Sequence, residues 1–214
     1  MITIKSVQVG KVVTEGAPDA SDLNKRQWTS AFRKCPIEGP VQIGPLGIEG
    51  DQVADSKNHG GPEKAVLCYA GAHYDDWQRE HPELEFGGGG FGENLTLNHL
   101  TEAEACVGDQ WSNGSCILEI SQPRQPCWKI SRRWKTKTMT KEVTQTGRTG
   151  WYVRVLQAGV IAAADELTLL ERPHPDWTVA RANDVLFGRE VDRMAVHELM
   201  NLPALSQQWK EALS

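Results

Sequence analysis

The stretch Val107-Gly-Asp-Gln-Trp-Ser-Asn-Gly-Ser-Cys-Ile-Leu-Glu-Ile-Ser121 predicts a β-hairpin. Apolar residues alternate along its two arms, and the Asn113-Gly114 pair between them is a strong turn signal. Further short strands, separated by turns that often contain glycine, are predicted over residues 2–13, 41–48, 65–69, 150–156, 159–164 and 166–170. Many short strands with little helix favour a β-barrel or a β-sandwich, so the predicted fold class is mainly β.

Helical patterns are few in the first four fifths of the chain and dominate its end. Residues 72–80 predict a helix and residues 138–145 a second short one, whereas the polar residues 15–25 predict a loop. After a proline-rich break at residues 173–175, helices are predicted over residues 179–187, 191–200 and 205–213. We therefore expect a barrel domain of residues 1–172 and a small C-terminal three-helix appendage of residues 173–214.

A helix-turn-helix module that reads DNA is the alternative interpretation of this appendage. From Pro173 onward the sequence has four Lys and Arg residues against six Asp and Glu residues. A module that enters a DNA groove should be basic, so the DNA-binding interpretation is disfavoured.

Composition and charge exclude other functional classes. The chain has 214 residues, of which 39% are hydrophobic, and a net charge of −5, which is unfavourable for binding nucleic acid through bulk charge. No apolar run approaches the roughly 20 residues of a membrane span, and no signal peptide is recognisable, so a cytoplasmic protein is expected. Five cysteines without a C-x-x-C pair argue against a disulfide framework and a structural zinc site.

Directly after the hairpin comes Ser121-Gln-Pro-Arg-Gln-Pro-Cys127-Trp-Lys129, which holds the strongest candidate for a functional side chain. Prolines cannot donate to a sheet ladder, so the chain should leave the strand at about Ser121 and present Cys127 in a rigid loop. Arg124 and Lys129 favour the thiolate, which is both the nucleophilic form of cysteine and a metal ligand. Two other cysteines lie among apolar neighbours that are typical of buried strands, namely Cys68 and Cys116.

Three more groups of residues could bind a ligand, and each has a structural alternative. In His59-Gly-Gly61, followed by Lys64, the glycines allow either close approach of a ligand or an unusual turn. The run Gly87–Gly90 matches no nucleotide-binding fingerprint. It is either a flexible loop or a backbone rim on which Asn94 offers a donor and an acceptor to a heterocycle.

The third group combines hydroxyl groups with cations. Thr29 and Ser30 precede Arg33 and Lys34, and this combination suits a phosphate group. A solvated basic turn would have the same composition, and the residues of this group alone favour that simpler interpretation.

Taken together, these motifs resemble those of the MOSC family, whose domain is related to the C-terminal part of molybdenum cofactor sulfurases. The resemblance spans most of residues 1–172, and the order and spacing of the motifs make it specific. The subgroup that it resembles most is the bacterial YiiM type, which is tied to resistance against N-hydroxylated base analogues and carries a three-alpha domain after the barrel. The motifs are Phe32-Arg-Lys34, Gly39-Pro-Val41, Gly47-Ile-Glu-Gly-Asp51, His59-Gly-Gly-Pro-Glu-Lys64, Phe91-Gly-Glu-Asn-Leu95 and Gln122-Pro-Arg-Gln-Pro-Cys127.

The resemblance implies a MOSC-type β-barrel with a few short helices that binds the molybdenum cofactor, a pterin dithiolene that carries molybdenum and a phosphate. Cys127 stands at the position of the family's invariant cysteine and would supply a thiolate to molybdenum. A soft sulfur ligand suits such a metal better than a set of carboxylates. Lys34, with Ser30 and Arg33, would face the phosphate or the pterin of the cofactor.

The remaining roles that the resemblance implies concern the pterin and the pocket wall. Glu93 and Asn94 would form hydrogen bonds with the pterin edge, and His59 and Lys64 would line the pocket. Arg124 would hold the Cys127 loop and offset the negative charge of the cofactor. The sequence departs from the family pattern in its long glycine tract before Phe91.

The implied function is a molybdenum-dependent oxidoreductase that detoxifies N-hydroxylated compounds of the 6-hydroxylaminopurine type, without pyridoxal phosphate. The cofactor would supply the redox chemistry, and the protein the thiolate and the orientation. The expected partners are a small N-hydroxylated substrate and an external electron-donor protein with a flavin or an iron–sulfur cluster, without nucleic acid or membrane. A second copy of the chain, in a homodimer, is a further possible partner. The three-helix appendage would dock the donor or close the pocket.

Two other functions remain open from the residues. Cys127 could carry a persulfide and deliver sulfur to the assembly of metal–sulfur clusters or cofactors. The protein could also be a carrier that binds the cofactor without turnover. Metal analysis separates the first alternative from the reductase, and reduction of a hydroxylaminopurine separates the second.

Overall fold

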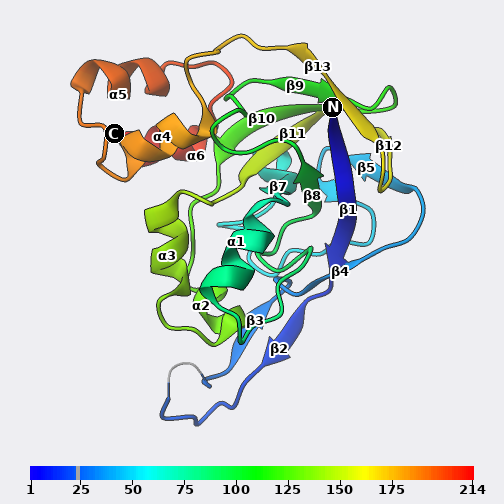
Figure 1. Cartoon of the computed structure of the whole chain (residues 1–214), viewed down its shortest axis with the longest axis vertical. Helices are drawn as coiled ribbons and strands as arrows, with labels where there is room; N and C mark the ends of the chain where they lie inside the picture. Colours follow the sequence, from blue (N-terminus) through cyan, green and yellow to red (C-terminus); the bar gives the residue numbers. More distant parts are fainter. Residues whose placement is uncertain (23–24) are drawn as a thin grey trace.

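The computed structural model describes residues 1–22 and 25–214 (Figure 1). The loop predicted over residues 15–25 includes residues 23–24, which lie outside the described residues. Within the described chain no helix is long and apolar enough to cross a membrane.

A closed β-barrel forms the centre of the described structure. Eight strands form one sheet, and seven of them close into the barrel because β1 pairs with both β8 and β13. The neighbouring barrel strands run antiparallel, except for the parallel pair β7 and β8. The barrel strands are β1 (Ile2–Gly10), β7 (Val66–Ala70), β8 (Leu95–Asn98), β9 (Gln110–Ser112), β10 (Ile117–Pro123), β11 (Trp151–Gln157) and β13 (Glu166–Glu171). The predicted mainly β fold is therefore confirmed.

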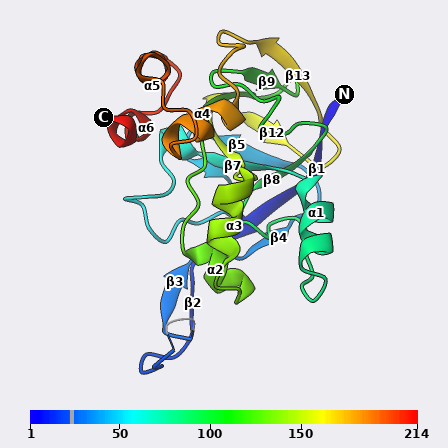
Figure 2. The ribbon, with the colours of Figure 1, turned by 60° about the vertical axis from the view of Figure 1, so that its left-hand side comes forward.

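Short strands extend the barrel at its margins. The fourth strand, β4 (Lys34–Pro36), pairs with the end of β1. A separate sheet combines β5 (Val41–Gly44), β6 (Gly47–Ile48) and β12 (Gly159–Ile161). The hairpin of β2 (Val13–Glu15) and β3 (Trp28–Ser30) projects from the barrel in both views (Figures 1 and 2).

Among residues 1–22 and 25–172, three short α-helices lie on the barrel, and one 3-10 turn spans Pro62–Lys64. The predicted helices over residues 72–80 and 138–145 are confirmed as α1 (His73–Glu80) and α3 (Met139–Thr146). The helix α2 (Lys129–Trp134) was not predicted from the sequence. Its buried residues Ile130 and Trp134 lie one turn apart, but a helix of six residues is too short to show a recognisable helical period.

The predicted C-terminal helices are confirmed as α4 (Val179–Leu186), α5 (Arg193–Met200) and α6 (Gln207–Leu213). Each begins with a side-chain cap, in which Thr178, Asp192 or Ser206 accepts a hydrogen bond from a backbone N–H of the first turn. The helices enclose a hydrophobic cluster of their own around Trp177, Leu199 and Trp209, and Val107 of the barrel region also belongs to this cluster.

Helix α6 is attached directly to strand β10, which leads to Cys127. The backbone N–H of Ser206 donates to the carbonyl of Ser121 at 2.9 Å. The hydroxyl of Ser206 donates to Oε1 of Gln122 at 2.6 Å, and both side chains are buried. One serine therefore caps α6 and fixes it to the strand that precedes the predicted loop.

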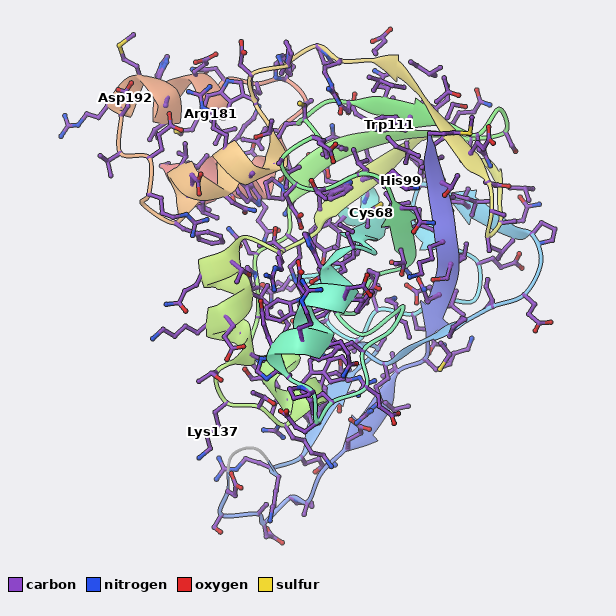
Figure 3. All side chains as sticks on the ribbon, viewed as in Figure 1. Cys68, His99, Trp111, Lys137, Arg181 and Asp192 are labelled. Atoms are coloured by element: carbon purple, nitrogen blue, oxygen red, sulfur yellow. The ribbon has the colours of Figure 1, made fainter. Side chains whose placement is uncertain are left out.

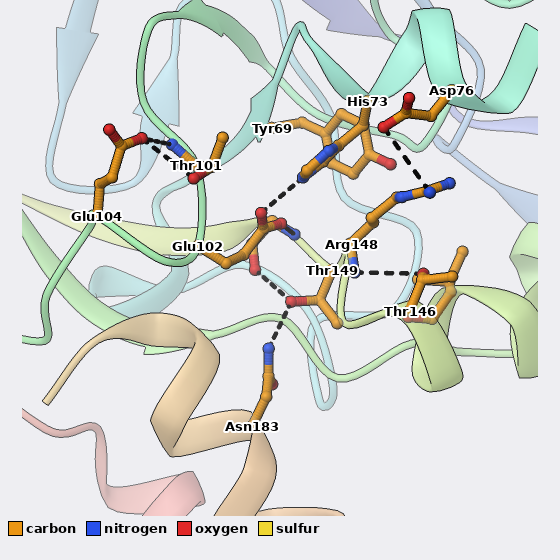
Figure 4. Close-up of polar contacts among 12 residues, drawn as sticks. Tyr69, His73, Asp76, Thr101, Glu102, Glu104, Thr146, Arg148, Thr149 and Asn183 are labelled. Carbon is orange, nitrogen blue, oxygen red and sulfur yellow. Dashed lines mark hydrogen bonds and ion pairs between the residues drawn. The ribbon is translucent and has the colours of Figure 1, made fainter.

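A buried polar network connects the barrel with α1 and α4 (Figure 4). Glu102 accepts a hydrogen bond from the backbone N–H of Gly150 at 2.7 Å, and its other oxygen lies 2.6 Å from Nε2 of His73. Nδ2 of Asn183 in α4 donates to the hydroxyl of Thr149 at 2.9 Å. The segment at residues 149–150 is thus held from both sides.

Candidate functional site

Cys127 lies in the loop between β10 and α2, where the sequence predicts it. The predicted point at which the strand ends, Ser121, is too early, because β10 continues to Pro123, which pairs with Trp151. The next residue, Arg124, donates its backbone N–H to Gly150 at 3.0 Å. Successive N–H groups along a strand point to opposite sides, so the N–H that Pro123 lacks would point away from β11. On that side β9 has already ended, and the proline therefore costs no hydrogen bond between strands.

The loop is fixed in front of two adjoining pockets. The carbonyl of Cys127 accepts hydrogen bonds from the backbone N–H of Ile130 and the hydroxyl of Thr140, both at 3.1 Å. Its half-buried side chain lines a first pocket of about 610 Å³ and a second of about 720 Å³. Cys127 is therefore positioned at the junction of both pockets.

The other candidate cysteines are structural, as predicted. Cys68 is buried in β7, and Cys116 is buried beside the hairpin loop. Burial raises the pKa of the Cys116 thiol to about 11 and that of the Cys68 thiol still further. Both thiols stay protonated near neutral pH, in agreement with a role in packing.

The first pocket brings together most of the residues that the sequence singles out. They come from distant parts of the chain, between β3 at residue 30 and the Cys127 loop, and meet at one end of the barrel. The predicted site residues in its lining are Ser30, Lys34, His59, Lys64, Asn94, Arg124 and Cys127.

Two predicted site residues lie outside the lining of both pockets. The exposed Arg33 pairs with Glu15 at 2.5 Å. Glu93 is fully buried, and its carboxylate accepts hydrogen bonds from the hydroxyl of Tyr74 and from the backbone N–H groups of Gly89, at 2.7 Å, and Phe91, at 3.1 Å. In this structure Glu93 thus supports the glycine tract, and a contact with a pterin stays a prediction.

The glycine tract is packed beneath the pocket rather than forming its rim. A side-chain carbon at Gly89, whose φ is +84°, would come within 2.6 Å of the carbonyl oxygen of Lys34. A side-chain carbon at Gly88 would lie 2.4 Å from Nε2 of Gln8. The glycines therefore permit close packing against β1 and β4, and the rim is made by Phe91 and Gly92.

Lys34 is neutralised by a residue that was not proposed as part of the site. Its Nζ lies 2.6 Å from both oxygens of Asp51, and Asp51 also accepts from Nδ2 of Asn94 at 2.9 Å. Burial lowers the pKa of Lys34, while Asp51 opposes that shift. The pair forms one polar wall of the first pocket.

Arg124, in contrast, is a buried cation without a carboxylate partner among the described residues. Its side chain is 4% exposed. The guanidinium donates only to two backbone carbonyls, those of Phe91 at 3.3 Å and Thr149 at 3.5 Å. A buried cation is costly unless an anion compensates it, so the charge of Arg124 makes the pocket favourable for a negatively charged ligand.

We expect Arg124→Met to stabilise the ligand-free protein by about 1–2 kcal/mol, because it removes an uncompensated buried charge. The same change should weaken retention of an anionic ligand by about 100-fold. Urea denaturation of cofactor-free protein measures the first effect, and cofactor content after purification the second. Arg124→Lys keeps the charge and is the matched control. A Met variant that keeps a normal cofactor content would contradict this role of Arg124.

His59 reports the electrostatic potential of the pocket. Burial and the nearby cations Lys129, Arg124 and Lys64 lower the pKa of His59 to about 4, against the opposing effect of Asp55. Its Nδ1 is buried without a hydrogen-bond partner and lies 3.6 Å from Oδ2 of Asp55, which is too far for a hydrogen bond. His59 is therefore neutral near pH 7 and has a free ring nitrogen.

This lowered pKa predicts an acid-sensitive contribution to stability. Between about pH 6.5 and pH 4 the unfolded state protonates His59 while the folded state does not, so stability falls as the pH falls. The side chain is about a third exposed, and we expect a loss on the order of 1–2 kcal/mol across this window. Urea denaturation at several pH values gives the dependence of the free energy of unfolding on pH. The His59→Gln variant should lose the decrease in stability between about pH 6.5 and pH 4 that His59 contributes. An unchanged slope would show that His59 does not titrate in this way.

Several lining residues were missed by the sequence analysis as site candidates. The sequence around Asp51 does not predict its pairing with Lys34, and Lys129 stands out in the sequence only as a neighbour of Cys127. Tyr152 lines both pockets, and burial raises its pKa to about 12, so its phenol keeps its proton. Gln208 of α6 lines the second pocket and accepts a hydrogen bond from Nζ of Lys64 at 2.5 Å. No local pattern could have placed a residue of the last helix in this pocket.

Comparison with family models matches residues 55–168 to the MOSC domain and residues 177–214 to the YiiM-like, 3-alpha helix domain. The chain belongs to the MOSC family. The predicted domain boundary between residues 172 and 173 falls between the two matches and stays a prediction. The expected resemblance to the YiiM subgroup is confirmed.

Known MOSC relatives match over most of this chain. Protein YiiM of Escherichia coli is 34% identical over 86% of this chain and 83% of its own length. A protein of Gibberella moniliformis named "Reductase" is 39% identical over 82% of this chain, which spans only 32% of that relative. The crystal structure of YiiM from Geobacillus stearothermophilus superposes with a TM-score of 0.82 at 32% identity, covering 100% of this chain and 97% of that one.

The MOSC pocket does not contain a metal site made of protein side chains alone. Among the described residues, no group of three or more His, Cys, Asp and Glu side chains could hold a metal ion. A metal bound at Cys127 must therefore bring most of its ligands with it. The lining of the first pocket, with four Lys and Arg residues against two Asp residues, suits a ligand that also brings negative charge. These features fit the molybdenum cofactor, with which MOSC domains are generally associated.

Proposed function

We propose that this protein is a molybdenum-cofactor-dependent reductase of N-hydroxylated compounds such as 6-hydroxylaminopurine. The observation that carries the proposal is the half-buried thiol of Cys127 at the junction of two pockets, next to the buried, uncompensated guanidinium of Arg124. The fungal MOSC relative named "Reductase" supports an oxidoreductase.

The first pocket would hold the cofactor. Cys127 would supply a thiolate to the metal, and Arg124 with Lys64 would offset the negative charge of the ligand. Ser30 lines the same pocket and would offer its hydroxyl to a pterin or its phosphate, whereas Nδ2 of Asn94 already donates to the carbonyl of Gln8 and to Asp51. The cofactor, once bound, supplies the two-electron redox chemistry.

The second pocket would admit the substrate to the other side of Cys127. Reduction of an N-hydroxyl group takes up two electrons and two protons, breaks the N–O bond and yields an amine and water. The lowered pKa of His59 keeps its imidazole neutral, and its Nδ1 has no hydrogen-bond partner among the described residues. The raised pKa of Tyr152 keeps its phenol protonated. Tyr152 can therefore donate a hydrogen bond to the hydroxyl oxygen. Lys64 can relay protons from solvent, regaining its own proton and charge after each transfer.

The proposal is tested by the composition of protein made in a molybdenum-replete host. We expect near-stoichiometric molybdenum, a fluorescent pterin on denaturation, and reduction of 6-hydroxylaminopurine with a chemical reductant. A protein with molybdenum and pterin but without turnover would be a cofactor carrier. A protein without molybdenum, but with sulfane sulfur on Cys127, would be a sulfur carrier for cluster or cofactor assembly, and the reductase proposal would be wrong.

A further inference from the structure

The charges of this chain are distributed very unevenly. The whole sequence has 23 Lys and Arg residues and 28 Asp and Glu residues. Residues 121–141 nevertheless contain seven cations and no acidic residue. This segment includes the Cys127 loop, α2 and the start of α3. Its cations are Arg124, Lys129, Arg132, Arg133, Lys135, Lys137 and Lys141.

Five of these cations reach the surface beyond the pocket, over α2 and the first turn of α3. Lys135, Lys137 and Lys141 are exposed, and Arg132 and Arg133 are half-buried. Lys137 extends away from the body of the protein in Figure 3. Helix α2 adjoins the β2–β3 hairpin, because the guanidinium of Arg132 lies 5.7 Å from the ring centre of Trp28.

Most of these charges are not compensated within the described chain. Several arginines elsewhere form ion pairs, for example Arg148 with Glu80 at 2.9 Å and Arg172 with Asp109 at 2.7 Å. No ion pair is found within residues 1–22 and 25–214 for the cations Lys129, Arg133, Lys135, Lys137 and Lys141. Exposed cations such as Lys5 and Arg193 likewise form no ion pair within the described residues, so the distinguishing feature of residues 121–141 is their seven cations without one acidic residue. Such a concentration of positive charge suits an acidic partner.

Two tryptophans are part of the same surface. Trp128, which follows Cys127 directly, is 53% exposed. Its ring meets Trp28 edge-on at 5.8 Å, and the guanidinium of Arg132 lies 5.6 Å from its centre. An exposed tryptophan held by a second tryptophan and an arginine is typical of the residues that dominate binding energy in protein interfaces.

We propose that this surface, the basic face, docks a small acidic electron-donor protein that carries a flavin or an iron–sulfur cluster. The basic face comprises Trp28, Trp128, Arg132, Arg133, Lys135, Lys137 and Lys141. The inference rests on the proposed reductase function, which consumes two electrons and two protons for each N–O bond broken. One two-electron oxidation of a reduced flavin, or two one-electron oxidations of an iron–sulfur cluster, supplies these electrons, and water supplies the protons.

The position of the basic face makes it a better docking site for this donor than the C-terminal appendage. The face borders the Cys127 loop through Trp128, so a bound donor would lie beside the proposed redox centre. The appendage carries six acidic residues and four cations from Pro173 onward and would repel an acidic donor. Its attachment through Ser206 to Ser121 and Gln122 instead fits a role in completing the pocket.

The test compares a protein donor with a chemical reductant on the cofactor-loaded protein. Reduced flavodoxin, an acidic protein with a flavin, is the probe donor, and reduced methyl viologen is the chemical reductant. The variant Lys137→Glu/Lys141→Glu reverses two exposed charges of the basic face without touching either pocket. The matched control, Lys5→Glu/Arg193→Glu, makes the same charge change at exposed positions elsewhere.

We expect kcat/KM for flavodoxin to fall by about tenfold or more in the basic-face variant at low salt, with viologen-driven turnover unchanged. The control should stay within about twofold of the wild type with either reductant, since distant exposed charges are screened. Added salt should slow the flavodoxin reaction of the wild type and narrow the gap to the variant.

Three results would overturn the basic face as a donor site. These are an equal loss in the control variant, an equal loss with viologen, and tight single-stranded oligonucleotide binding that the variant loses while its flavodoxin rate is unchanged. The last result would assign the face to nucleic acid. A wild type without viologen-driven turnover would count against the reductase function itself. Calorimetric titration with flavodoxin then still decides the docking question, because binding needs no turnover, and no binding would reject the face.

Discussion

Cys127→Ala protein should retain its fold and lose at least about 100-fold of its turnover with a chemical reductant. Loss of groups that only support a metal ligand typically costs 10–100-fold, and Cys127 would be a ligand itself. The fold should persist because the carbonyl of Cys127, which accepts hydrogen bonds from Ile130 and Thr140, is kept in the variant. X-ray absorption at the molybdenum edge should show one sulfur ligand fewer, which separates loss of the thiolate from general damage.

The matched control for this variant is Cys35→Ala. Cys35 is an exposed free cysteine in β4 and does not line either pocket. The Cys35→Ala variant should leave turnover and sulfur coordination unchanged. A loss in this variant as well would reveal an effect shared by exposed thiols, such as oxidation. Full turnover by the Cys127 variant, with unchanged sulfur coordination, would remove the central residue from the proposed mechanism.

The second large effect is expected in the C-terminal region. Trp209→Ala should lower the free energy of unfolding by about 3–5 kcal/mol, the range for truncating a fully buried tryptophan. The side chain is 0% exposed and packs in the cluster that α4, α5 and α6 enclose with Val107. Urea denaturation followed by circular dichroism measures this loss. The matched control is Met194→Ala in α5, whose side chain is 79% exposed and should change stability by less than about 0.5 kcal/mol.

The consequence of Trp209→Ala should extend to the pocket. Helix α6 holds Ser206 on strand β10 and brings Gln208 to Lys64 in the second pocket. Loosening α6 should therefore increase hydrogen exchange at the Ser206 amide, whose acceptor is the carbonyl of Ser121. If the variant unfolds at the same urea concentration as the wild type, or if Ser206 stays protected, the helices contribute less to the pocket than their contacts indicate.

The local parts of the fold were readable from the sequence. The Asn113-Gly114 signal correctly identified the hairpin of β9 and β10, although the loop has four residues between the paired Ser112 and Ile117. Oδ1 of Asn113 accepts from the backbone N–H groups of both Ser115 and Cys116 at 3.0 Å, which lengthens the turn. The helical pattern after Pro175 likewise sufficed for the C-terminal helices.

Features that depend on distant residues could not be read in the same way. Closure of the barrel by Ile2 and Leu167 joins the two ends of the domain, and alternation of apolar residues does not specify which strands pair. In the site, Cys127 was identifiable because two prolines and two cations surround it in sequence. The pairing of Lys34 with Asp51, and the burial of Arg124 without a carboxylate, are tertiary facts that decide which cation is free to meet an anion.

The attachment of Ser206 to strand β10 has a consequence for biosynthesis. During translation, the first strand emerges long before its barrel partners, since Thr3 pairs with both Asn98 and Glu166. The last backbone contact to the strand before Cys127 forms only when Ser206 has left the ribosome. A nascent chain therefore cannot complete this attachment before the C-terminal helices have been synthesised, so we expect cofactor loading to follow their folding.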